Sequence, residues 1–365
     1  MPKPQQPELR RSERGATDSD GAKSGPGLAA PPPTSDAPGP VPEDNRPGHH
    51  PDREQDKPVA RYRRRAARAA DQARRQLAPG EIEIDAGGMT FSALEAGRQG
   101  DDLVLVLHGF PQTAEAWRPQ LEGLAGDGYH VVAPNQRGYS PGARPTGLHN
   151  YRLDCLVDDV LQIADRLDAR RFHLVGHDWG GVVAWATAAR QPQRLRSLTV
   201  VSTPHPRAYA SALLRSPQLL RSGYMGFFAL PFVPEALLGA GGGAPLRRLL
   251  TRSGLPADWA ARYVDEIVER GALHSALNWY RALPLAGTPV GKVDVPTLYV
   301  WSDGDVALGE AAARATASQV RGQYRFEVLE GVSHWIPETR PDELRRLIGE
   351  HLHANGATAL VAAGQ

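Results

Sequence analysis

Sulfur chemistry and long apolar runs are nearly absent from this sequence of 365 residues. Its single cysteine, Cys155, has no partner for an intramolecular disulfide and is expected to be a core thiol within an amphipathic helix. No window approaches about 18 consecutive apolar residues, so no membrane span is predicted. Neither a C-x-x-C pair nor an H-E-x-x-H motif occurs, and the 12 histidines are scattered, so no metal and no cofactor are predicted.

Acidic and basic residues nearly balance, which gives a formal net charge of +1. Because no basic field extends over the whole chain, a nucleic-acid partner is not expected. The stretch 61–75 is a local exception, with seven arginines against a single acid, Asp71. Such a run can attract nucleic acid or an anionic membrane surface, but a solvated tail is the favoured interpretation.

The first 78 residues lack the apolar content of a folded domain. Thirteen of the 32 prolines fall within residues 1–60, among few aliphatic or aromatic side chains. Such a segment cannot bury enough apolar surface to offset its ordering entropy, so residues 1–78 are expected to be a disordered tail. Residues 356–365 are expected to be a flexible end. The pair Arg10-Arg11 is not followed by the apolar run of an export signal, so a cytoplasmic location is expected.

From residue 81 onward, short β-like runs alternate with helical ones, which predicts an α/β fold with a mostly parallel sheet covered by helices on both faces. The expected strands are Glu81–Asp85, Thr90–Ala96, Leu103–Leu107, His130–Ala133, Phe172–Val175, Leu198–Ser202, Thr297–Trp301 and Arg325–Leu329. One helix is expected to begin at a capping Asp154. Its buried stripe would comprise Leu156, Val160, Ile163, Ala164 and Leu167.

The alternation stops between residues 204 and 296, a stretch rich in leucine, alanine, arginine and aromatic residues. We expect a helical cap here, inserted into a core made of residues 79–203 and 297–355. Because the insertion follows a strand of the sheet, the cap should lie over the carboxyl ends of the strands, where α/β proteins bind their ligands.

The segment Gly176-His177-Asp178-Trp179-Gly180 lies between an apolar run and a helical one. A strand that enters a helix through so tight a turn holds its middle residue in a strained conformation and exposes the side chain. The residues two positions away must then be nearly free of side chains, as both glycines are. The pattern predicts a nucleophile elbow with Asp178 at its tip.

An aspartate at the elbow restricts the chemistry. A carboxylate that attacks an acyl carbon forms a reactive mixed anhydride, whereas attack on an electrophilic sp3 carbon gives an ordinary ester that water can open. Asp178 therefore favours epoxides or alkyl halides as substrates over acyl compounds.

Five motifs follow one another in a recognisable order: His108-Gly109-Phe110-Pro111, Gly176 to Gly181, Ser202-Thr203-Pro204-His205-Pro206, Asn278-Trp279-Tyr280-Arg281 and Gly331-Val332-Ser333-His334-Trp335. Over roughly residues 81–350 the chain resembles the epoxide hydrolases of the α/β-hydrolase fold. The resemblance implies a mostly parallel eight-stranded sheet with flanking helices and an inserted helical cap. It also implies a cofactor-independent hydrolase that acts on a small hydrophobic epoxide with water.

The resemblance also implies roles for individual residues. His334, in a turn after the last strand, matches the general base, a task that suits the pKa of imidazole. Its carboxylate partner matches Asp305, while Asp303, beside Gly304, is expected to be a turn residue. The backbone N–H groups of Phe110 and Trp179 match the oxyanion hole. Residues expected around the substrate pocket are His108, Pro111 and Trp335.

Epoxide opening needs a proton donor, because an alkoxide is a poor leaving group. Tyr280 matches a cap tyrosine of the epoxide hydrolases and can supply the proton. A second cap tyrosine is in doubt because Phe227 occupies its slot, and Tyr224 could replace it only from one helical turn away.

Two alternatives stay open. A haloalkane dehalogenase shares the aspartate and Trp179, but it commonly carries asparagine where this chain has Phe110, which has no amide to bind a halide. A binding protein that has lost turnover is the other alternative, kept open by Phe227. Neither the natural epoxide nor the oligomeric state is predicted by the sequence.

Overall fold

The computed structural model describes residues 77–285 and 289–356. The predictions for the tail at 1–78, with its basic stretch at 61–75, and for the end at 356–365 therefore lie outside the described residues, apart from residues 77, 78 and 356.

An eight-stranded sheet forms the centre of the described chain, in the order β1-β2-β4-β3-β5-β6-β7-β8. The strands β1 and β2 and the pair β2 and β4 are antiparallel, and all other neighbours are parallel. All eight predicted strands are confirmed, with small differences at their ends. Their bounds are β1 Gly80–Ala86, β2 Met89–Ala96, β3 Leu103–Leu107, β4 His130–Pro134, β5 Phe172–His177, β6 Leu195–Val201, β7 Thr297–Ser302 and β8 Tyr324–Leu329.

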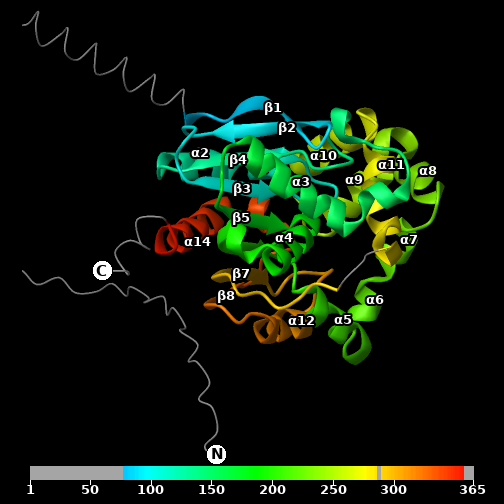
Figure 1. Cartoon of the computed structure of the whole chain (residues 1–365). Coiled ribbons are helices and arrows are strands. Elements are labelled where there is room, and N and C mark those ends of the chain that lie inside the picture. The colour runs from blue at the N-terminus through cyan, green and yellow to red at the C-terminus, as the bar shows by residue number, and fades with distance from the viewer. Residues whose placement is uncertain (1–76, 286–288, 357–365) are drawn as a thin grey trace, which may run out of the picture. The chain divides into compact units, whose positions relative to one another are not determined.

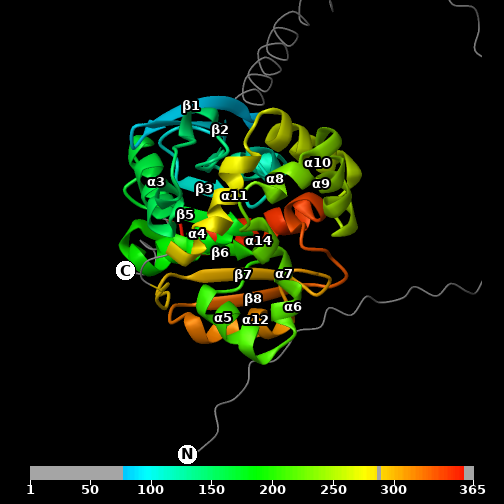
Figure 2. The same cartoon turned by 90° about the vertical axis from the view of Figure 1, so that its right-hand side faces the viewer.

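Helices cover both faces of the sheet. Helices α3 and α4 pack together on one face, and α2 and α14 pack together on the other (Figures 1 and 2). The helices outside the β6–β7 connection are α2 Arg118–Gly126, α3 Leu153–Arg166, α4 Trp179–Arg190, α12 Glu310–Ala315, α13 Ile336–Thr339 and α14 Pro341–Ala354. Short 3-10 turns occur at Ala114–Trp117, Pro141–Ala143, Leu148–Tyr151, Pro192–Arg194 and Thr316–Gln319.

The connection from β6 to β7 is helical throughout most of its described length. Its helices are α5 Pro206–Arg215, α6 Gln218–Arg221, α7 Gly223–Phe228, α8 Val233–Leu238, α9 Ala240–Arg252, α10 Ala257–Val264 and α11 Leu273–Arg281, with a π-helical turn at Asp265–Glu269 and a 3-10 turn at Leu283–Leu285. Helices α7, α8, α9 and α11 lie beyond one end of the strands, as Figure 1 shows, whereas α5 packs against α12. The division into core and cap remains a prediction.

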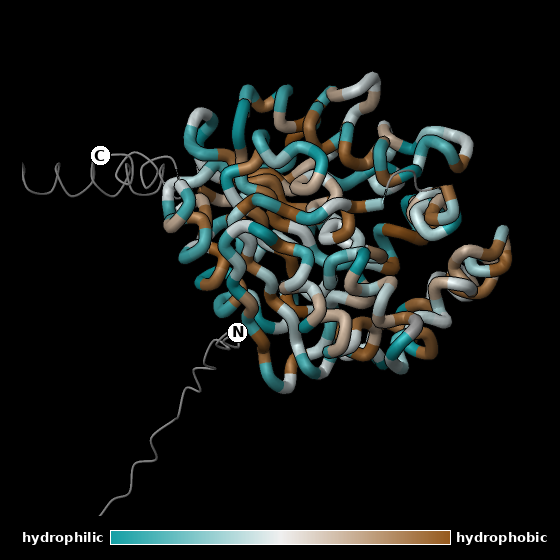
Figure 3. Tube along the Cα trace, turned by 60° about the horizontal axis from the view of Figure 1, so that its bottom comes forward, coloured by the Kyte–Doolittle hydropathy of each residue, from teal (hydrophilic) through white to brown (hydrophobic). Residues whose placement is uncertain are grey.

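The core is built from the apolar strands. Every residue of β3 and of β4 is buried, and the apolar residues of β5 are fully enclosed. Figure 3 shows apolar segments running through the interior of the trace, with polar segments at its outer turns. A strand buried on both faces reads as a continuous apolar run, which is why β3 was visible in the sequence. Within residues 77–285 and 289–356, no helix is long and apolar enough to cross a bilayer.

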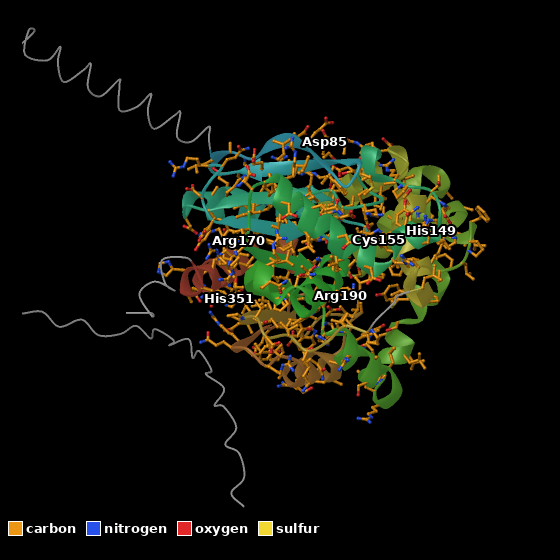
Figure 4. All side chains as sticks on the ribbon, viewed as in Figure 1. Asp85, His149, Cys155, Arg170, Arg190 and His351 are labelled. Carbon is orange, nitrogen blue, oxygen red and sulfur yellow. The ribbon has the colours of Figure 1, made fainter. Side chains whose placement is uncertain are left out.

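Two predictions about helix α3 are wrong. Arg152 holds the cap position, and Asp154 lies in the first turn, where it pairs with Arg190. Cys155 is half-buried instead of being a core thiol, because it lies beside the buried stripe of the helix. Its Sγ lies 3.6 Å from the carbonyl oxygen of His149, and Figure 4 labels both residues on the same side of the molecule.

Candidate active site

The segment from β5 to α4 has the geometry of the predicted elbow. Asp178 links the strand to the helix with φ 51° and ψ −120°, a strained conformation for a residue with a side chain. A Cβ on Gly176 would collide with the backbone of Gly180, and a Cβ on Gly180 with the carbonyl group of Leu107. Both glycines are therefore required by the close approach of the backbone.

The carboxylate of Asp178 has a partner on each oxygen. Its Oδ1 accepts a hydrogen bond of 2.8 Å from the backbone N–H of Phe110, and its Oδ2 lies 3.7 Å from Nε2 of His334. Its own carbonyl oxygen accepts a hydrogen bond from Thr203 Oγ1. Burial acts to raise the pKa of Asp178, but the contacts with His334, His177 and Phe110 outweigh it and lower the pKa. The side chain is therefore ionised, and at 16% exposure it is open to a ligand.

His334 lies between two carboxylates. Its Nδ1 is 2.7 Å from Oδ2 of Asp305, whose Oδ1 accepts the backbone N–H groups of Ala307 and Leu308. Burial opposes a charge on the imidazole, yet the charge of Asp305 and the contact with Asp178 outweigh burial and raise the pKa of His334 to about 10. The resting imidazole is therefore protonated at neutral pH.

The two aspartates after β7 have different environments. The side chain of Asp305 is fully enclosed beside His334, whereas Oδ1 of Asp303 accepts the backbone N–H of Gly331 at an exposed position. Asp303 thus joins the loop after β7 to the loop after β8. It does not contact His334, whose imidazole is hydrogen-bonded to Asp305.

Two apolar cavities, of about 130 and about 200 Å³, both reach Asp178. Tyr224 and Tyr280 line both cavities. Trp179 lines the smaller one, and the larger one is also lined by Phe110, Pro111, His334 and Trp335. The structure therefore brings together every side chain expected around the site except that of His108.

The two tyrosines are held among aromatic rings. Tyr280 contacts the rings of Phe110, Trp179 and Phe228, and Tyr224 packs edge-on against Phe228. Burial, and then the charge of Asp178, raise the pKa values of both phenols well above their usual range, so both retain their protons.

Helix α7 carries both Tyr224 and Phe227, the residue that occupies the expected slot of a second cap tyrosine. Tyr224 lies one turn before Phe228 on this helix and faces the cavities, while Phe227 is not among the residues that line them.

His108 lies away from the two cavities, which corrects the expectation that it borders the substrate pocket. Its Nδ1 lies 2.9 Å from the carbonyl oxygen of Gly109, and its Nε2 accepts the backbone N–H of Gln136. Burial lowers the pKa of His108 to about 4, so the ring is neutral. Its contribution is to hold the loop that carries Phe110.

Sequence reasoning missed three residues that surround these groups. Thr203 holds the carbonyl group of Asp178, and Gln112 and Glu338 join in a buried hydrogen bond of 2.6 Å. Thr203 and Gln112 stand within or next to motifs already singled out, which was the available signal. The sequence carries no such signal for Glu338, because a single glutamate in a short segment cannot be told from an exposed surface residue.

Comparison with known proteins shows the family of the chain. A family model for the alpha/beta hydrolase fold matches residues 102–341. The human protein called epoxide hydrolase 4 is 35% identical over 281 residues, which cover 73% of this chain and 76% of that protein. The AB hydrolase superfamily protein YfhM of Bacillus subtilis is also 35% identical, over 74% of this chain and 96% of that protein.

Comparison with solved structures also finds epoxide hydrolases. The crystal structure of epoxide hydrolase A from Mycobacterium thermoresistibile is 27% identical in sequence and matches with a TM-score of 0.65. The match covers 76% of this chain and 99% of that one. The chain described here therefore belongs to the epoxide hydrolase family of the α/β-hydrolase fold and is a hydrolase of that class.

Proposed function

We propose that this hydrolase opens a hydrophobic epoxide to a vicinal diol through a covalent ester on Asp178. The observation that carries the proposal is the position of the Asp178 carboxylate: His334 lies 3.7 Å away, and two protonated tyrosines line the same cavities. The cavities are apolar, which suits an epoxide with hydrocarbon substituents.

In the first step, a carboxylate oxygen of Asp178 attacks a ring carbon of the epoxide, and the bond from that carbon to the ring oxygen breaks. The oxygen takes a proton from Tyr280, assisted by Tyr224, so that no free alkoxide forms. The high pKa of both phenols keeps the proton available until the ring oxygen becomes basic.

In the second step, the proton that His334 carries at rest first passes to the phenolate left on Tyr280 by the first step. The neutral imidazole, oriented by Asp305, then accepts a proton from water, and the resulting hydroxide attacks the carboxyl carbon of the ester. The negative charge that develops on the carboxyl oxygen is stabilised by the N–H of Phe110, which already contacts Oδ1 at 2.8 Å, and by that of Trp179. The bond from the carboxyl carbon to the alkyl oxygen then breaks, and this oxygen takes the proton of the added hydroxyl group. The diol leaves, one water oxygen stays in the Asp178 carboxylate, and His334 keeps the proton taken from water, which restores the resting state.

Haloalkane dehalogenation is the second candidate. Its halide leaves as a weak base and needs N–H donors instead of an acid, but the residue at the loop position is Phe110, whose ring packs against Tyr280. Two phenols at the cavities favour the epoxide reaction. A binding protein without turnover is disfavoured by the intact arrangement of Asp178, His334 and Asp305.

The experiment is incubation of the purified protein with styrene oxide and measurement of diol. Asp178→Ala should abolish diol formation, and single turnover in oxygen-18 water should place label in Asp178. The two aspartates after β7 supply a matched pair: Asp305→Asn should lower turnover at least about 100-fold, and Asp303→Asn should leave it near the wild-type rate. Diol that persists in Asp178→Ala, or halide release from a bromoalkane with little epoxide turnover, would contradict the proposal.

Residues 204–296 are proposed to act as the cap that supplies the tyrosines, over a core of residues 79–203 and 297–355. The proposed substrates are a small hydrophobic epoxide and water, and the proposed location is the cytoplasm.

A further inference from the structure

Glu338 is a buried carboxyl group to which the reaction above gives no role. It lies on α13, four residues after His334, and is 8% exposed. Its Oε1 accepts hydrogen bonds from Gln112 Nε2 at 2.6 Å and from the hydroxyl group of Tyr263 at 2.7 Å. Its Oε2 has no partner among the described residues. Burying a carboxyl group without a cation is costly, so this position calls for an explanation.

Gln112 connects this carboxyl group to the loop that carries Phe110. Its Oε1 accepts the backbone N–H of Gly109 at 2.8 Å, which fixes the orientation of the amide and turns the Nε2 group toward Glu338. A Cβ on Gly109 would collide with the carboxyl group of Asp178. Gln112 therefore holds the backbone next to Phe110, whose N–H belongs to the proposed oxyanion hole of the second step.

His177 extends the chain of contacts to the proposed base. Its Nδ1 lies 2.8 Å from Gln112 Oε1, the same oxygen that accepts the Gly109 N–H. Its Nε2 lies 3.0 Å from the carbonyl oxygen of His334, which Ser202 Oγ also contacts. The rings of His177 and His334 are 4.8 Å apart, so a displaced His177 would displace His334.

Tyr263 brings α10 into the same network. The hydroxyl of this fully buried residue donates to Glu338 from the helical connection between β6 and β7. Two further contacts join that connection to the residues beside His334: Ser253 accepts the indole N–H of Trp335, and the carbonyl oxygen of Gly254 accepts the hydroxyl of Ser333. The link through Glu338 continues by hydrogen bonds to Gln112, whereas the link through Trp335 reaches His177 by ring packing, with the ring centroids 6.2 Å apart.

We propose that Glu338 is a positioning residue: through Gln112 and His177, its Oε1 holds the imidazole of His334 in line with Asp178. Because Tyr263 donates to the same carboxyl group, this alignment also depends on the position of α10. The inference rests on the proposed function and adds to it a residue that acts on the second step. An aligned imidazole is needed to activate water, whereas the attack of Asp178 on the epoxide does not require His334 as a base.

The test separates the two chemical steps in the full-length protein. Stopped-flow tryptophan fluorescence follows ester formation, since Trp179 and Trp335 line the cavities, and intact mass measures the fraction of protein carrying the ester. Glu338→Leu should slow ester hydrolysis about 10- to 100-fold, change ester formation less than about 3-fold, and so accumulate the ester. Glu338→Gln keeps an oxygen acceptor and should hydrolyse the ester within about 3-fold of wild type.

Two further variants make the outcome decisive. Tyr263→Phe removes one hydrogen-bond donor to Glu338 and should accumulate less ester than Glu338→Leu but more than wild type. If Glu338→Leu does not fold, this variant tests the inference in its place. Glu343→Gln, at an exposed acid on α14, is the matched control and should behave as wild type.

The inference is overturned if Glu338→Leu slows both steps equally, if it leaves ester hydrolysis unchanged, or if Glu338→Gln behaves like Glu338→Leu. Absence of diol from the wild-type enzyme would instead overturn the proposed function.

Discussion

The pKa of His334 offers the sharpest test of the electrostatics of the site. The imidazole lies 2.7 Å from Asp305 and 3.7 Å from Asp178, and its pKa is raised to about 10. Two unit charges about 4 Å apart interact by about 4 kcal/mol at an effective dielectric constant of about 20. This energy corresponds to about 3 units of pKa. The substitution Asp178→Asn should therefore lower the pKa of His334 by about 3 units, to near neutrality, while Asp305 keeps the ring in place.

The assay is an NMR titration of protein with labelled histidine rings between pH 5 and 11, with the His334 signal identified by its loss in His334→Gln. Glu343→Gln removes a charge on the exposed face of α14 and serves as the control that should leave the titration unchanged. If the pKa of His334 in Asp178→Asn stays within about one unit of the wild-type value, the two groups are not coupled as the distance requires, and the reasoning fails.

Three further predictions concern stability and geometry. Gly109→Ala places a Cβ against the carboxyl group of Asp178, so diol formation should fall at least about 100-fold with an unchanged circular dichroism spectrum. Arg137 donates to Asp159 at 2.5 and 2.7 Å in a buried pair, so Arg137→Met should lower the free energy of unfolding by about 3–5 kcal/mol in urea denaturation; a loss below about 1 kcal/mol would contradict this. The raised pKa of His334 stabilises the fold below pH 6.5, and this contribution disappears as the pH rises toward 10. Wild-type protein should therefore lose more stability than His334→Gln between those pH values.

The sheet could be predicted because the residue patterns of its strands are recognisable in the sequence. Leu103–Leu107 is buried on both faces and reads as an unbroken apolar run. The start of α3 was predicted wrongly, because Asp154 has the chemistry of a cap but finds Arg190 as a partner, and caps depend on the backbone one or two residues upstream.

The candidate site also contains residues that could be predicted from the sequence and residues that could not. Asp178 could be located because a tight strand-to-helix turn demands glycines at fixed spacing around it. Whether Tyr224 or Phe227 faces the cavity could not be predicted, since it depends on the rotation of α7, a helix of six residues set by its packing. The network from Glu338 to His177 was beyond prediction, because it joins residues 226 apart in the chain through Gln112.

The arrangement of charges gives the two proposed steps an order. While Asp178 is ionised, it holds the His334 imidazole in the protonated state, so the ring cannot take a proton from water and Asp178 remains the available nucleophile. Once Asp178 becomes an ester, its negative charge is gone and one of the two carboxylates that raise the pKa of His334 no longer does so. The imidazole then loses its proton more easily, to the phenolate left on Tyr280, and becomes a base at the stage that needs one. In the proposed mechanism the charge of Asp178 thus controls the protonation of His334, so a buried histidine with so high a resting pKa is compatible with the proposed role as a base.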